Sequence, residues 1–140
     1  MFFGSFTYSL DNKGRLVVPA KFRLAVDETL YAMRGHEKCL SLFPVASFEK
    51  LQDRIGKLDY NQKAARDYIR VMLGSTIEMT IDSHGRIQIP VTTCKLYGLE
   101  GLVRIIGVGD HIEVWSEDAW TKYEQAADAS FEATAESLKE

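Results

Sequence analysis

The chain of 140 residues has few of the features that mark secreted, membrane-spanning or metal-binding proteins. It contains two cysteines, Cys39 and Cys94, and neither belongs to one of the paired cysteine or histidine motifs of a metal site. Both lie among apolar residues, so we expect two buried free thiols. No stretch approaches the roughly 18 apolar residues of a membrane-spanning helix. The N-terminal segment also lacks the basic start and cleavage site of a signal peptide, so we expect a cytoplasmic protein without membrane contact.

Motifs of the common enzyme classes are also missing. The sequence has no glycine-rich phosphate-binding loop and no local pattern typical of Ser-His-Asp or Cys-His catalysis. The histidines His36, His84 and His111 fall in predicted turns or at strand starts, so we expect them to be exposed and not to be metal ligands. These absences favour a protein that is not an enzyme and has no cofactor.

The formal net charge of −3 argues mildly against a nucleic-acid binder, but the charges are unevenly distributed. Residues 1–23 contain four basic residues and one acidic residue, a net charge of +3, whereas residues 116–140 carry −5. A phosphate backbone responds to the local field and not to the total charge. The N-terminal segment is therefore the candidate for contact with an anionic partner.

One nine-residue pattern occurs twice, as Asp11–Pro19 (DNKGRLVVP) and Asp82–Pro90 (DSHGRIQIP), at an offset of 71 residues. Both copies read Asp-x-x-Gly-Arg, followed by alternating apolar residues and a proline. The similarity continues over about 45 residues, with one slip of a single residue. The chain is therefore interpreted as a duplication of one unit.

Each unit predicts the same order of elements. An alternating strand leads into a tight turn that carries a glycine, a short second strand ends at a proline, and one or two helical turns follow. A β-hairpin and an amphipathic helix complete the unit. The hairpin turns are predicted at residues 35–38 and 107–110.

Two more features of the helices follow from the sequence. Apolar spacing indicates a linker helix at about 62–73, with Gly74 as the residue just beyond its end. Ser116 is a good N-cap residue, and we expect one helix from Glu117 to about Leu138. In that helix Phe131 and Leu138 are predicted to pack against the chain itself or against another subunit.

Neither repeat can bury a core alone, because four short strands and one helix leave a sheet edge and an apolar face uncovered. We therefore expect a mainly β (α+β) fold in which the two repeats interlock in one pseudo-symmetric β-barrel with helices outside. The predicted boundaries are a first repeat at 1–58 (core about 5–47), a linker helix at 59–74, and a second repeat at 75–140 (core about 76–119) that includes the C-terminal helix.

The arginine of the repeated pattern is the main candidate for a functional contact. Arg15 directly follows the turn glycine, so its planar guanidinium projects near a hairpin tip and suits phosphate oxygens or a guanine edge. Asn12 and Lys13 lie on the same turn. Lys21 and Arg23 follow in the next helical turn and are expected close to Arg15, because the strand between them is short.

The second copy of the pattern forms a weaker anion-binding surface. His84 stands where the first copy has Lys13, and threonines flank the position that corresponds to Lys21. We therefore treat Arg86 as a secondary contact. Four residues are assigned to turn structure: Asp11, Gly14, Asp82 and Gly85. Spacing alone also allows each Asp–Arg pair to do no more than build its hairpin.

The whole chain resembles the MraZ family of bacterial proteins. Five segments carry the resemblance: MFFGSFTYSLDNKGRLVVPAKFR, RGHEKCLSLFP, VMLGS, DSHGRIQIP and IIGVGDHIEVWSEDAW. The Gly14–Arg23 element is also similar to AbrB-like DNA-binding domains and, more loosely, to MazE-type antitoxins. The resemblance implies two tandem SpoVT-AbrB-like domains in a swapped-hairpin (double-split) β-barrel.

The same resemblance implies a sequence-specific DNA-binding regulator that represses its own promoter and the adjacent division and cell-wall genes. Its partners would be double-stranded DNA with short repeated promoter boxes, and copies of itself in a ring of about eight to twelve subunits. It would be associated with the nucleoid, and the functional arginine would be Arg15, with Lys13, Lys21 and Arg23 beside it. The alternative is a protein-interaction module of the antitoxin type, which binds a protein partner.

Overall fold

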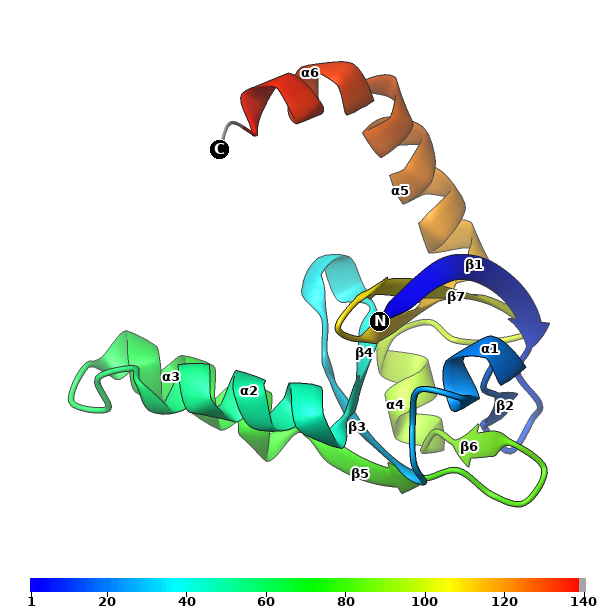
Figure 1. Ribbon diagram of the computed structural model, residues 1–140, viewed down its shortest axis with the longest axis horizontal. Coiled ribbons are helices and arrows are strands. Elements are labelled where there is room, and N and C mark those ends of the chain that lie inside the picture. The colour runs from blue at the N-terminus through cyan, green and yellow to red at the C-terminus, as the bar shows by residue number, and fades with distance from the viewer. Residues whose placement is uncertain (139–140) are drawn as a thin grey trace.

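A computed structural model describes residues 1–138, and both halves of the chain contain two strands, a short helix, two more strands and a longer helix in that order (Figure 1). The first half forms β1 (Phe2–Ser9), β2 (Arg15–Val17), α1 (Ala20–Arg23), β3 (Thr29–Arg34), the 3-10 turn η1 (His36–Lys38), β4 (Leu40–Pro44) and α2 (Val45–Gly56). The second half follows as α3 (Lys63–Gly74), β5 (Ile77–Thr80), β6 (Arg86–Gln88), α4 (Val91–Leu96), β7 (Leu102–Gly109), β8 (Ile112–Ser116), α5 (Glu117–Ala129) and α6 (Phe131–Ser137).

The two halves exchange strands. The large sheet has six strands in the order β1-β7-β8-β4-β3-β5, so β1 of the first half pairs with β7 of the second, and β5 pairs with β3. Strands β2 and β6 form a separate antiparallel ribbon. The fold is thus α+β with a mainly antiparallel sheet and peripheral helices. Within residues 1–138 hydrogen bonding leaves β1 and β5 as sheet edges and does not close the expected barrel.

The core lies between the large sheet and the ribbon. Leu16 of β2 and Ile87 of β6 face each other in the ribbon, and each side chain is 1% exposed. In the same core α1 places Phe22 edge-on against Phe2 and Phe6 of β1, with ring centroids 5.6 and 5.3 Å apart. The hydrophobic contact between the halves therefore fixes the ribbon on the body of the protein.

Both cysteines are buried and free, as predicted. Burial raises the pKa of the Cys39 thiol to about 12, so this group stays protonated at neutral pH. The third histidine differs from its prediction. The side chain of His111 is only 21% exposed and stacks on the Phe43 ring at 4.5 Å, because β8 pairs with β4 in the sheet and brings the two rings together.

The helices project from the sheet on two sides (Figure 1). α2 and α3 form a helical arm that Phe48 anchors by stacking on Tyr31 of β3 at 4.1 Å. α5 begins at Ser116, whose side chain accepts a hydrogen bond from the backbone of Ala119, and curves away with α6. No helix in the described part of the chain has the length and apolar character needed to cross a membrane.

The second hairpin turn is shorter than predicted. β7 continues to Gly109, and the backbone N–H of Val108 donates to the carbonyl of His111, so the turn begins at Gly109. Gly107, which the prediction placed in the turn, pairs with Gly4 and Ile112 instead. A Cβ atom there would collide with the backbone of β1, so this glycine permits the close approach of the exchanged strand.

Two helix ends also differ from the prediction. The C-terminal helix is divided at Ser130, whose hydroxyl donates to the carbonyl of Ala126 and competes with the helical hydrogen bonds. Phe131 is 67% exposed in α6, so it makes no core contact. Gly74 is the last helical residue of α3 and not the residue after it, since the Ser75 hydroxyl donates back to the Val71 carbonyl at 2.6 Å.

Candidate nucleic-acid interface

Both copies of the repeated pattern fold into the same aspartate-anchored turn. Asp11 accepts backbone hydrogen bonds from Lys13 at 2.9 Å and Arg15 at 2.8 Å through Oδ1, and it pairs with Arg15 Nε at 2.6 Å through Oδ2. Asp82 does the same with the backbone of His84 and Arg86, and pairs with Arg86 Nε at 3.2 Å. Each carboxylate therefore builds the turn and orients an arginine.

The turn glycines are required by the backbone. Gly14 and Gly85 have φ angles of +80° and +76°, the left-handed region that glycine adopts without strain. Each turn also lies against the other half of the chain. A Cβ at Gly14 would collide with the carbonyl oxygen of Ile89, and one at Gly85 would collide with the guanidinium of Arg23.

Hydrogen bonds lower the pKa of both turn aspartates. The backbone N–H of Arg15 has the largest effect on the pKa of Asp11, and that of Arg86 has the largest effect on Asp82. Both carboxylates are therefore ionised at neutral pH. Each holds its arginine through Nε only, and the terminal guanidinium nitrogens of Arg15 and Arg86 donate no hydrogen bond to any of residues 1–138.

The two arginines share one face of the β2–β6 ribbon. Arg15 is paired with Gln88, Leu16 with Ile87, and Val17 with Arg86. Because side chains alternate along a strand, Leu16 and Ile87 face the core and the other four face outward. The arginines are diagonal neighbours on this outer face, and the Cα atoms of such a pair are typically roughly 7–8 Å apart.

The other candidate contact residues do not gather at one place. Asn12 and Lys13 are exposed on the turn at one end. Lys21 Nζ lies over the Phe3 ring at 3.7 Å. Arg23 was expected beside Arg15, but its Nη1 donates to the Val18 carbonyl at 2.8 Å and its guanidinium covers the second turn. The reason is that β2 runs antiparallel to β6, so the end of β2 and the start of α1 lie at the opposite end of the ribbon.

Sequence reasoning missed Gln88 and Lys95. The Gln88 amide donates to the Lys13 carbonyl at 3.1 Å and so links the second strand to the first turn. Lys95 of α4 lines a cavity of about 680 Å³ beside that turn, together with Asn12 and Cys94. The repeat offset aligns Cys94 with Arg23, and its Sγ donates to the equivalent carbonyl, that of Ile89, at 3.7 Å. Only the antiparallel pairing of β2 and β6 reveals these neighbours.

The geometry favours contact with double-stranded DNA. A two-stranded antiparallel ribbon fits the major groove, where an arginine fork can bind guanine O6 and N7. The ribbon has such a fork near each end, and Lys13 is exposed on the turn beside Arg15. Among residues 1–138 there is no group of three or more His, Cys, Asp or Glu side chains placed to hold a metal ion.

A family model described as "MraZ protein, putative antitoxin-like" matches the chain twice, over residues 1–71 and 72–140. The chain belongs to the MraZ family. A relative from Natranaerobius thermophilus, named "Transcriptional regulator MraZ", is 38% identical over 138 residues, which cover 99% of this chain and 96% of the relative. Proteins of the same name from Kocuria rhizophila and Syntrophomonas wolfei are 38% and 33% identical over the same shares of both chains. The predicted family is confirmed.

Proposed function

We propose that the protein is a sequence-specific DNA-binding transcriptional regulator that reads bases with the outer face of the β2–β6 ribbon. One observation carries this proposal. Two arginines are held by ionised aspartates through Nε, on an exposed face, and their terminal nitrogens are left available. The names of the relatives, which describe transcriptional regulators, support it.

In this proposal the residues of the ribbon have different roles. Arg15 binds the edge of a guanine, and Arg86 makes a secondary contact near the other end. Asn12, Lys13, Lys21 and Arg23 contact phosphates, which fix the position of the ribbon but carry no sequence information. Asp11, Gly14, Asp82 and Gly85 build the turns. Each phosphate contact displaces condensed cations, so binding weakens as salt concentration rises.

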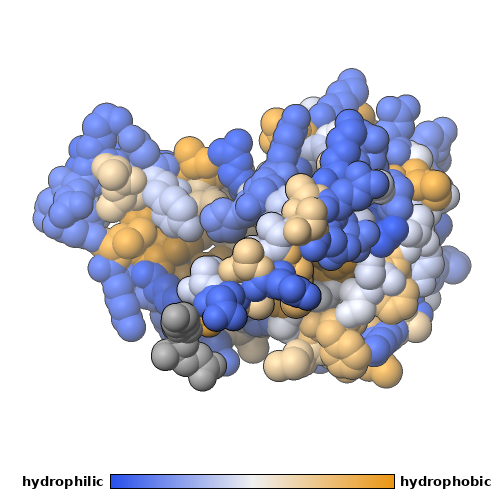
Figure 2. All heavy atoms as spheres, turned by 90° about the horizontal axis from the view of Figure 1, so that it is seen from above, coloured by the Kyte–Doolittle hydropathy of each residue, from blue (hydrophilic) through white to orange (hydrophobic). Residues whose placement is uncertain are grey.

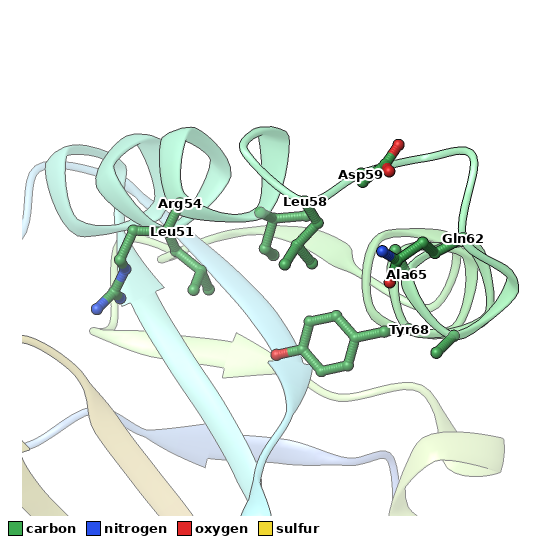
Figure 3. Close-up of a pocket in the computed structure, with 9 residues that line it drawn as sticks. Leu51, Arg54, Leu58, Asp59, Gln62, Ala65 and Tyr68 are labelled. Carbon is green, nitrogen blue, oxygen red and sulfur yellow. The ribbon is translucent and has the colours of Figure 1, made fainter.

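We further propose that copies of the chain assemble into a ring of about eight to twelve subunits. An apolar groove of about 660 Å³ lies between α2 and α3 and is lined by Leu51, Ile55, Leu58 and Tyr68 (Figure 3). Hydrophobic side chains also gather on the surface of this arm (Figure 2), and Phe131 of α6 is exposed. Such surfaces support self-association, because uncovered apolar patches of this kind usually mark contacts with other molecules.

The ring gives a physical reason for repeated DNA boxes. The first 23 residues carry a net charge of only +3, so a single subunit is expected to bind weakly. Several linked subunits that bind several boxes multiply that affinity. The proposed targets are the boxes of the protein's own promoter and the adjacent division and cell-wall genes, which places the protein at the nucleoid.

We also propose that the two repeats, at 1–58 and 75–140, form a swapped-hairpin barrel and that residues 59–74 link them. The exchange of β1 and β5 between the halves supports this arrangement.

The first test is a fluorescence-anisotropy titration with DNA from upstream of the gene and with scrambled DNA of equal length, at two salt concentrations. The parent should bind the upstream DNA more tightly, with strong salt dependence. Arg15→Ala should lose about 1–3 kcal/mol of binding free energy on the upstream DNA only, because the scramble lacks the guanine contact.

The matched control is Lys50→Ala, which removes one positive charge from an exposed position on α2. It should bind both DNAs as the parent does. Light scattering should show the same assembly size for all three proteins. The proposal is wrong if Arg15→Ala binds the upstream DNA as tightly as the parent. Equal and weak binding of the parent to both DNAs would favour the antitoxin-type module that binds a protein partner.

A further inference from the structure

The two arginines of the ribbon have different neighbours. The copies of the repeated pattern agree at the aspartate, the glycine and the arginine, but two positions after the arginine the first has Val17 and the second Gln88. The register places Gln88 opposite Arg15 and Val17 opposite Arg86. On the outer face, the two arginines are therefore placed symmetrically, but one lies opposite an amide and the other lies opposite a hydrocarbon.

Val17 is an apolar residue on the outer face of the ribbon. Its side chain is 37% exposed, whereas Leu16, its neighbour in the strand, is 1% exposed and fills the core. Valine favours the strand conformation, and its place on the outer face also leaves part of a branched hydrocarbon accessible to a binding partner. In the major groove the apolar group available to such a side chain is the C5-methyl of thymine.

Gln88 has the opposite chemistry. Its amide nitrogen donates one hydrogen bond to the Lys13 carbonyl, which holds the side chain beside the first turn. The second amide hydrogen and the carbonyl oxygen have no partner among the described residues. This donor and acceptor match N7 and N6 of adenine, which glutamine binds in the major groove.

We infer that Val17 and Gln88 set the sequence preference of the ribbon: Val17 contacts a thymine methyl near the base read by Arg86, and Gln88 binds an adenine near the base read by Arg15. This inference rests on the proposed function. Two residues along a strand span roughly 7 Å, about two base-pair steps, so both pairs of side chains can reach bases of one short site. A symmetric ribbon would read a palindrome. This ribbon reads a directional site, so every subunit binds its box in one orientation.

The test uses the full-length protein and the upstream DNA with single base analogues. Replacing each thymine by uracil removes one methyl group, and replacing each adenine by 7-deazaadenine removes one N7 acceptor. At one or more positions uracil should weaken binding about fourfold, the equivalent of one buried CH₂ group. Val17→Ser should lose that sensitivity and keep the sensitivity to 7-deazaadenine. Gln88→Leu should show the reverse pattern.

Both side chains are exposed, so neither variant is expected to unfold, and thermal melting checks this. The inference is overturned if no uracil or 7-deazaadenine substitution affects the parent, or if the variants keep the sensitivity of the parent. The comparison with scrambled DNA distinguishes failure of this inference from failure of the proposed function. A parent that prefers the upstream DNA but ignores the analogues refutes only this inference. A parent that does not prefer the upstream DNA refutes the proposed function and the inference with it.

Discussion

At the scale of single residues, the Asp–Arg pair would prepare an arginine for the base contact of the proposed function. A free arginine side chain carries about 2 kcal/mol of rotamer entropy, part of which is lost when it is fixed on a base. Asp11 already restricts Arg15 through the Nε contact and through the turn backbone. Less entropy is therefore lost on binding. Spacing alone left open whether the Asp–Arg pair only builds the hairpin or also presents the arginine to a partner. In this geometry it can do both.

The turn itself depends on Gly14. Gly14→Ala should lower the free energy of unfolding by more than about 2 kcal/mol, because the Cβ is strained at positive φ and collides with the Ile89 carbonyl. Gly74→Ala is the matched control, since open space surrounds that glycine in a helix and the change should be neutral or stabilising by up to about 1 kcal/mol. Denaturant unfolding measures both values. Equal effects of the two substitutions would show that the turn tolerates a side chain.

At the scale of elements, the β7–β8 hairpin is fixed to the body by His111. Its Nδ1 lies 2.7 Å from Asp110 Oδ1, its Nε2 lies 3.6 Å from Glu113 Oε2, and its ring stacks on Phe43 of β4. Burial lowers the pKa of His111, but the hydrogen bonds with Glu113 and Asp110 outweigh this effect, and the pKa is raised. The protonated form is thus favoured in the folded protein.

The stability of the protein should therefore depend on pH through this histidine. A pKa raised by folding contributes stability below the unfolded value of about 6.5, and this contribution is lost as pH rises through the folded pKa. The Tm of the parent should fall relative to that of His111→Gln as pH rises above about 6.5. Melting curves in buffers of equal ionic strength measure the difference. Parallel curves for the two proteins would mean that His111 does not titrate in this way.

Local chemistry explains which elements could be predicted. Asp, Gly and Pro at fixed spacing determine the turns and the ends of β2 and β6, so these elements were located from the sequence. The turn at 107–110 was misplaced because Gly107 serves a strand from the other half of the chain, and no local signal shows that contact. The break at Ser130 was missed because serine in a helix only sometimes bonds to the preceding turn. The position of Arg23 likewise depended on the pairing of distant strands.

At the scale of the whole molecule, the exchange of strands joins the two repeats into one folding unit. Within residues 1–138, β1 pairs with β7 alone and β5 pairs with β3 alone. The core residues Leu16 and Ile87 also come from different halves and meet in the ribbon. The candidate DNA-binding ribbon also depends on both halves, since each half supplies one of its strands. Neither half alone can form the core or the candidate interface.

This dependence predicts that the halves fold only together. Fragments 1–60 and 61–140, produced separately, should each lack a cooperative melting transition, because β1 and β5 would be unpaired edges and the ribbon would be absent. Mixed in equal amounts they should recover the transition and the dispersed NMR spectrum of the whole chain. The control is the intact protein cleaved after folding at a protease site in the exposed connection between α2 and α3. It should stay folded, which would show that a break in the chain between α2 and α3 does not by itself unfold the protein. A cooperative transition in either separate fragment would mean that one repeat is stable alone and that strand exchange is not what holds the fold together.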